Sequence, residues 1–158
     1  MAEDLNIRIG TKQEQYESLI PQIEGLVTGE NNLIANLANI SAALKEQFNW
    51  WWVGFYWIHE DELVLGPFQG PVACSRIKKG RGVCGGAWAQ EKTLIVEDVE
   101  KFPGHIACSS ASKSEIVVPV YQNNTIVGVL DVDSEHLSHF DEMDQFYLEK
   151  IVALIPGK

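Results

Sequence analysis

The chain of 158 residues is 46% hydrophobic and 22% charged, a composition typical of one soluble globular domain. Its net charge of −10 repels phosphate groups, so we expect neither nucleic acid nor membrane partners. The acidic first residues do not resemble a secretory signal, and no apolar run approaches the roughly 20 residues that cross a bilayer. We therefore expect a cytoplasmic protein, in which three cysteines, an odd number, argue against a structural disulfide framework.

The N-terminal third predicts two helices. Residues 1–10 show no periodicity and are expected to form a loose arm. Thr11 and Glu14 have the spacing of a capping box that starts the first helix, which Pro21 either kinks or splits. Apolar residues then recur at helical spacing from about Glu30 to Phe48, which predicts the second helix.

An aromatic segment from Trp50 to His59 predicts a central β-strand. Alternation gives it two apolar faces: Trp50, Trp52, Gly54 and Tyr56 on one, and Trp51, Val53, Phe55 and Trp57 on the other. A turn leads into a second strand from Leu63 to Phe68, and the two strands form a predicted hairpin.

Glycine-rich segments hold all three cysteines, Cys74, Cys84 and Cys108. Any one free cysteine is more often a buried structural residue inside an apolar run. Here the thiols lie among loop-forming residues, where side chains stay reachable and the backbone approaches ligands closely. A short helix is expected at Val83–Gln90, and the long irregular segment 97–114 indicates a functional loop. This clustering favours a thiol-dependent redox catalyst.

The remaining elements are a short strand at Thr93–Val96, strands at Glu115–Tyr121 and Thr125–Asp133, and a helix that starts at about Asp141. The order of elements predicts an α+β fold. A central antiparallel sheet has the N- and C-terminal helices packed on one face and a ligand pocket under loops on the other. Because no linker or repeat interrupts the chain, we expect residues 1–158 to form a single domain.

A nucleophilic thiol must attack as the thiolate, and His105, three residues before Cys108, would favour that form. Attack on an oxidised substrate gives a sulfenic acid, which a second thiol condenses to a disulfide that a partner dithiol reduces. Cys74 is a candidate for this resolving thiol, and Cys84 either takes that role or lines the pocket. Zinc usually has about four ligands at short spacings, so no metal site is expected.

Carboxylates provide the second functional signal. Asp131 and Asp133 share one face of an otherwise apolar strand. Because burial of an unpartnered acid is costly, Asp131 is interpreted as a site residue. For Asp133 a turn or capping role is equally consistent with the sequence. Glu115 opens the neighbouring strand.

The register of this hairpin decides whether Glu115 joins the two aspartates. A two-residue turn at 123–124 places Glu115 opposite Val132, facing away from them. A three-residue turn at 122–124 places it opposite Asp131 on the same face, and we predict this second register. Three converging acids would suit a cationic group such as an α-ammonium, and one with a raised pKa could protonate a leaving oxygen.

Trp52 and Tyr56 flank Gly54 on one strand face. They could form an aromatic wall for a methyl group or a cation, although core packing is the more common fate of strand aromatics.

In their order along the chain, these motifs resemble the free methionine-(R)-sulfoxide reductases, which are GAF-domain enzymes. The resemblance covers roughly residues 30 to 155. It is carried by the segments Trp52–Tyr56, Gly66–Gly70, Gly80–Gly85, Gly104–Cys108, Ser114–Pro119 and Gly128–Ser134.

The resemblance implies that Cys108 attacks the sulfoxide sulfur and that Cys74 resolves the sulfenic acid, with Cys84 a third cysteine able to take part in disulfide exchange. It implies thioredoxin as the external reductant and no bound cofactor. The family is commonly dimeric, so a homodimer is also an expectation.

The resemblance further implies roles for the other candidates. The acids Glu115, Asp131 and Asp133 hold the free amino acid and assist protonation of the oxygen, and Trp52 and Tyr56 surround the S-methyl group. The alternative function is a GAF sensor that binds a small molecule without chemistry. A sensor is usually attached to an output domain, for which 158 residues leave no room. A structural interaction module leaves the cysteine and acid clusters unexplained.

Overall fold

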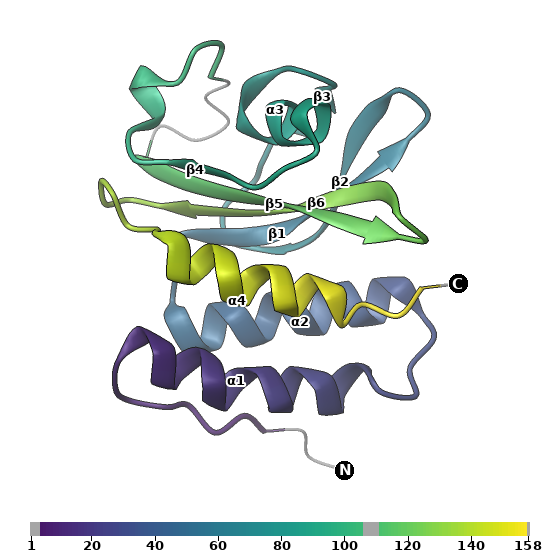
Figure 1. The fold of residues 1–158 in the computed structure, drawn as a ribbon, viewed down its shortest axis with the longest axis vertical. Helices are drawn as coiled ribbons and strands as arrows, with labels where there is room; N and C mark the ends of the chain where they lie inside the picture. Colours follow the sequence, from purple (N-terminus) through teal and green to yellow (C-terminus); the bar gives the residue numbers. More distant parts are fainter. Residues whose placement is uncertain (1–3, 106–110, 158) are drawn as a thin grey trace.

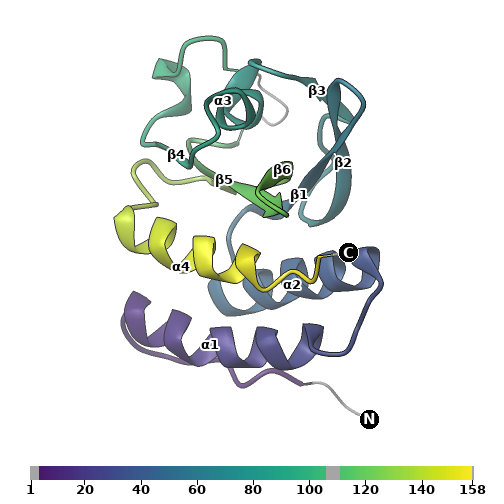
Figure 2. The same cartoon turned by 45° about the vertical axis from the view of Figure 1, so that its right-hand side comes forward.

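A six-stranded antiparallel sheet separates a helical side of the molecule from a loop side (Figure 1). The computed structural model describes residues 4–105 and 111–157. The strand order is β3-β2-β1-β6-β5-β4. Helices α2 and α4 cover one face of the sheet, α1 packs beneath them, and α3 lies on the opposite face (Figure 2). This arrangement confirms the predicted α+β fold with helices on one face and loops on the other.

The three helices of the helical side begin at side-chain caps. Helix α1 (Lys12–Val27) starts at the Thr11–Glu14 capping box and continues through Pro21 as one helix. Helix α2 (Leu33–Phe48) starts later than predicted because Asn32 caps it, accepting a hydrogen bond from the amide of Ala35. Helix α4 (Glu142–Ala153) follows the capping residue Asp141. None of the helices within the described residues has the length and apolar character to cross a membrane.

The strands are β1 (Trp52–His59), β2 (Glu62–Gln69), β3 (Arg76–Lys78), β4 (Leu94–Val96), β5 (Ser114–Gln122) and β6 (Thr125–Ser134). Helix α3 (Gly82–Gln90) and the short 3₁₀ helix η1 (Val99–Lys101) connect them. Strand β3 was missed by the sequence analysis. Only its central residue, Ile77, is buried, and the two flanking residues are charged and exposed, so it carries no apolar pattern.

The alternation predicted for β1 is confirmed within the strand. Val53 and Phe55 pack into the core on the helical side, and Trp52 and Tyr56 pack on the loop side. The prediction was wrong for the two residues before the strand. Trp50 belongs to the helical core, where its ring stacks on Phe48 at 4.5 Å, because β1 and its alternation begin only at Trp52.

The β5–β6 hairpin differs from both registers considered above. Its turn has two residues, Asn123 and Asn124, whose φ angles of 53° and 64° suit a tight hairpin turn. The predicted three-residue turn was therefore wrong. Between Val120 and Tyr121 the ladder shifts, because β6 holds one extra residue there. The bulge moves Glu115 opposite Asp133, which returns it to the face that carries the aspartates.

Candidate active site

A cavity opens on the loop side of the sheet, with an empty volume of about 560 Å³ that includes its mouth. Residues from β1, α3, β5, β6 and the connecting loops line it. Six of the side chains predicted for the site lie in its wall: Trp52, Tyr56, Cys84, Glu115, Asp131 and Asp133. The structure therefore brings together residues that are up to 81 positions apart (133 − 52) in the chain.

The acids come from neighbouring positions on two adjacent strands. Glu115 on β5 pairs with Asp133 on β6, and Asp131 lies two residues from Asp133 on the same face. Glu115 and Asp131 are each only 6% exposed, whereas Asp133 is half-buried. The predicted convergence of three acids on one cavity is present, although a bulge rather than a longer turn produces it.

Burial raises the pKa of all three carboxyls, and for Glu115 and Asp133 the negative charge of Asp131 raises it further. Ser112 opposes this effect at Asp133, to which its hydroxyl donates a hydrogen bond of 3.1 Å. The cluster therefore retains protons at pH values where isolated carboxyls have lost them. A buried carboxyl in this state can donate a proton to a bound oxygen.

One buried oxygen of the acid cluster has no hydrogen-bond partner among the residues that the structure describes. Asp131 Oδ1 is buried and forms no hydrogen bond within the described part of the chain. An unsatisfied buried polar atom costs free energy, so its presence indicates a position where a ligand supplies the missing donor. Across the sheet, Asp131 lies opposite Gly54 of β1.

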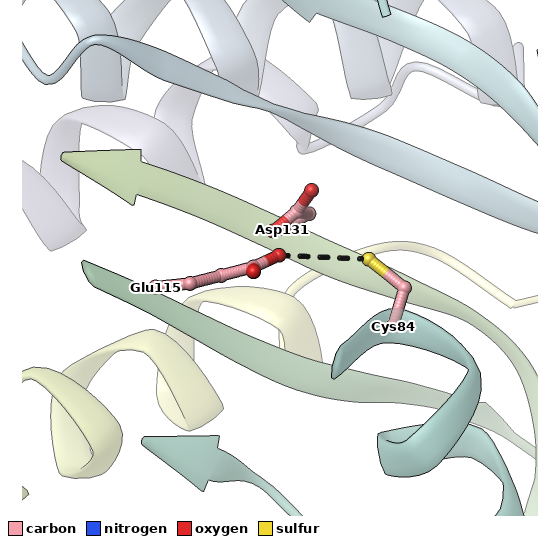
Figure 3. A group of neighbouring side chains, drawn as sticks. All are labelled: Cys84, Glu115 and Asp131. Atoms are coloured by element: carbon pink, nitrogen blue, oxygen red, sulfur yellow. Dashed lines mark hydrogen bonds between the residues drawn. The ribbon is translucent and has the colours of Figure 1, made fainter. Parts of the chain in front are cut away.

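Cys84 lies directly against the cluster of three acids. Cys84 is in the first turn of α3, is buried, and places its Sγ 3.9 Å from Glu115 Oε2 (Figure 3). Close packing of α3 on β3 makes this placement possible: a Cβ on Gly85 would lie 2.4 Å from the Lys78 carbonyl oxygen. Burial and the neighbouring acids raise the pKa of the Cys84 thiol well above its ordinary value. A thiol in this state is a poor nucleophile.

The aromatic wall is tied to the loop that carries Cys74. The rings of Trp52 and Tyr56 lie 6.0 Å apart with an interplanar angle of 24°. Trp52 Nε1 donates a hydrogen bond of 3.0 Å to the Pro71 carbonyl oxygen, and the Tyr56 hydroxyl donates one of 2.8 Å to the Cys74 carbonyl oxygen. The same side chains therefore shape the cavity and position the Cys74 backbone.

The predicted cysteines differ in their states. Cys74 is half-buried and disulfide-bonded, whereas Cys84 is a free thiol. Cys108, predicted as the nucleophile, lies outside the described residues. His105 lines the cavity, and burial lowers the pKa of its imidazole against the opposing charge of Asp131.

Sequence reasoning missed two polar residues of the cavity wall, Arg81 and Ser112. Arg81 is exposed and lies directly before α3, between two glycines of the Gly80–Gly85 segment. That position, three residues before Cys84, was an available signal for a cationic wall residue. Ser112 lies in a run of small polar residues that has no periodicity, so its contact with Asp133 had no sequence signal.

Comparisons with known proteins agree with this geometry. A family model described as GAF domain matches residues 35–155. "GAF domain-containing protein A" of Dictyostelium discoideum is 71% identical over 156 residues, covering 98% of this chain and 99% of that protein. The free methionine-R-sulfoxide reductase of Escherichia coli (strain K12) is 48% identical over 143 residues, covering 90% and 87%. The X-ray structure of the free methionine-R-sulfoxide reductase from Neisseria meningitidis in complex with its substrate has a TM-score of 0.95 at 52% identity, covering 98% of this chain and 93% of that chain.

Proposed function

This chain belongs to the GAF-domain family and, within it, to the free methionine-R-sulfoxide reductases, and we propose that it reduces free L-methionine (R)-S-oxide to L-methionine. The observation that carries this proposal is the acid cluster that lies beside Trp52 and Tyr56 on one face of the sheet, in the wall of one cavity. A sulfoxide needs a proton at its oxygen to be reduced, and its S-methyl group needs an apolar wall. The cavity supplies both.

The Asp131 oxygen that has no hydrogen-bond partner within residues 4–105 and 111–157 supports recognition of a free amino acid. An α-ammonium group carries donors that a peptide nitrogen lacks, and it is attracted by the negative cluster. We assign this contact to Asp131 and Asp133. Glu115, whose carboxyl is buried and has a raised pKa, is assigned to the protonation of the sulfoxide oxygen.

In the proposed reaction the Cys108 thiolate attacks the sulfoxide sulfur while the acid cluster protonates the oxygen. This attack forms an S–S bond, and the hydroxyl then passes from the substrate sulfur to the Cys108 sulfur as the S–O and S–S bonds break. Methionine leaves as the thioether, and Cys108 becomes a sulfenic acid. The Cys74 thiol then attacks the Cys108 sulfur, forming a disulfide and releasing the oxygen as water. The two electrons that reduce the sulfoxide thus come from two thiols. The disulfide-bonded state of Cys74 and the free state of Cys84 support Cys74 as the resolving residue.

Recycling of this disulfide requires an external dithiol, for which we propose thioredoxin acting by thiol–disulfide exchange. The chemistry needs no bound cofactor. A reducing compartment such as the cytoplasm would sustain it. A homodimer is also proposed on the family resemblance, and sedimentation velocity would test it.

A coupled assay tests the proposed function. Free methionine (R)-sulfoxide, thioredoxin, its reductase and NADPH should together give NADPH consumption with the wild type and none with Cys108→Ser. The (S) epimer and peptide-bound sulfoxide should be ignored. Binding of the sulfoxide without turnover would instead favour the alternative, a non-enzymatic GAF sensor.

A further inference from the structure

We propose that the reduced protein binds one divalent metal ion of the zinc class through Cys84, Glu115 and Asp131. The three side chains come from α3, β5 and β6, and all three are buried (Figure 3). One donor atom from each, the thiol sulfur and two carboxylate oxygens, lies within 4.8 Å of the other two. The sequence did not indicate this metal site because its three residues are separated by 31 and 16 positions (115 − 84 and 131 − 115).

The distance between the thiol and one carboxylate is close to that in a zinc coordination sphere. Zinc lies about 2.3 Å from a thiolate and about 2.1 Å from a carboxylate oxygen, so a tetrahedral site separates the two ligands by about 3.6 Å. Cys84 Sγ and Glu115 Oε2 are 3.9 Å apart. This pair is therefore only about 0.3 Å wider than in a bound site, and the Asp131 oxygen lies within 4.8 Å of both atoms.

A second observation points to a ligand at the same place. Asp131 is 6% exposed, and its Oδ1 atom has no hydrogen-bond partner within the described residues. A metal ion would satisfy this oxygen. His105 lines the same cavity and is a candidate for a fourth ligand, a position that water fills in open zinc sites.

The donor set selects the class of ion. A thiolate with carboxylates suits zinc and cobalt, which accept sulfur and four-coordinate geometry. Calcium and magnesium require six or more oxygen donors and do not select a thiolate. We therefore expect Zn²⁺ and Co²⁺ to bind and Mg²⁺ and Ca²⁺ not to compete.

An ion here would occupy Asp131, assigned above to the α-ammonium group, and Glu115, assigned to the sulfoxide oxygen, so Zn²⁺ should inhibit competitively with the sulfoxide. This consequence rests on the proposed function, whereas metal binding itself does not. The two are separable because binding is measured spectroscopically in the absence of substrate.

The test is a Co²⁺ titration of the full-length protein after reduction with a phosphine. We expect a thiolate-to-cobalt charge-transfer band and tetrahedral visible bands that saturate at one ion per chain and are displaced by Zn²⁺. Cys84→Ser should abolish the charge-transfer band. Asp131→Asn and Glu115→Gln should each weaken binding by at least about tenfold. Cys74→Ser is the matched control and should keep the band.

Two outcomes overturn the proposal: absence of the band from the folded wild type, or a band that survives Cys84→Ser and disappears in Cys74→Ser. Circular dichroism verifies that each variant is folded. Should Cys84→Ser fail to fold, unchanged affinity in both carboxylate variants would equally refute the site. Metal binding without inhibition would retain the site and count against the substrate assignment.

Discussion

Glu115 and Asp133 lie directly opposite each other across the β5–β6 ladder. Paired positions of this kind bring Cβ atoms to about 4.5–5.5 Å, and like charges placed there destabilise a sheet. Asp131, on the same face, adds a third acid. The sheet therefore bears an electrostatic cost at one place. Burial, and then the charge of Asp131, raise the pKa of Glu115 and Asp133, so that proton retention relieves this cost.

The first prediction concerns stability. Because burial raises the pKa of Glu115 well above 4.5, its ordinary value, the folded chain binds more protons than the unfolded chain. The free energy of unfolding should then fall as the pH rises from that value through the raised pKa. Glu115→Gln should be more stable than wild type at pH 7 by about 1 kcal/mol or more, with the gain disappearing below the ordinary pKa.

Urea unfolding at several pH values measures this effect. Glu97→Gln, which changes an exposed glutamate outside the cavity, is the matched control and should show no such pH-dependent gain. Equal stability of wild type and Glu115→Gln at every pH would contradict a costly carboxyl at this position.

The second prediction concerns catalysis by the same acid. If Glu115 donates its proton to the sulfoxide oxygen, kcat/KM should decline as the pH rises through the raised pKa and the cluster ionises. Glu115→Gln should lower kcat/KM by about 10²–10⁴-fold, the usual contribution of a general acid, and should remove that decline. A variant that kept the wild-type pH profile would assign the proton to another group.

The third prediction concerns the backbone beneath the aromatic wall. A Cβ at Gly54 would lie 2.2 Å from Phe68 Cβ and 2.9 Å from Trp52 Cη2. Gly54→Ala should therefore displace Trp52, destabilise the fold by about 1–3 kcal/mol and raise KM. Gly25→Ala is the matched control, because a Cβ there meets nothing within 4 Å and helix propensity favours alanine. Thermal unfolding of both variants checks this, and similar melting temperatures for the two would refute it.

The fourth prediction tests whether Cys74 or Cys84 is the resolving thiol. Cys74→Ser should release about one methionine per chain in a single turnover and then stop, because thioredoxin finds no disulfide to reduce. The amount of methionine in quenched samples measures the single turnover, and NADPH consumption at steady state measures continued cycling. Sustained turnover in Cys74→Ser that disappears on adding Cys84→Ser would move the resolving role to Cys84, against the raised pKa of that buried thiol.

Periodicity and capping residues were enough to predict the helices and most strands. Thr11 caps a helix in the structure as its sequence context indicated, and the last helix begins directly after Asp141, close to its predicted start, because capping depends on neighbouring residues. Strand β3 escaped prediction because its sheet position depends on pairing with β2, a distant contact that leaves no apolar period in three residues.

The sequence was enough to identify most residues of the candidate site, but not how they are arranged. The acids and aromatics were identified from strand alternation and the family resemblance. The bulge between Val120 and Tyr121 has no sequence signal of its own, so the pairing of Glu115 was predicted wrongly. The contact of Cys84 with Glu115 depends on how α3 packs against the sheet, which is set by tertiary structure and not by local pattern.

A single-turnover experiment on the reduced wild type, without thioredoxin, decides whether this chain is the enzyme described above. Free methionine (R)-sulfoxide is mixed with the protein, and the quenched products are analysed by mass spectrometry. We expect one methionine per chain and a disulfide that links Cys74 to Cys108, with Cys84 still a free thiol. Absence of methionine, or methionine formed while Cys108 remains an unmodified thiol, would contradict it.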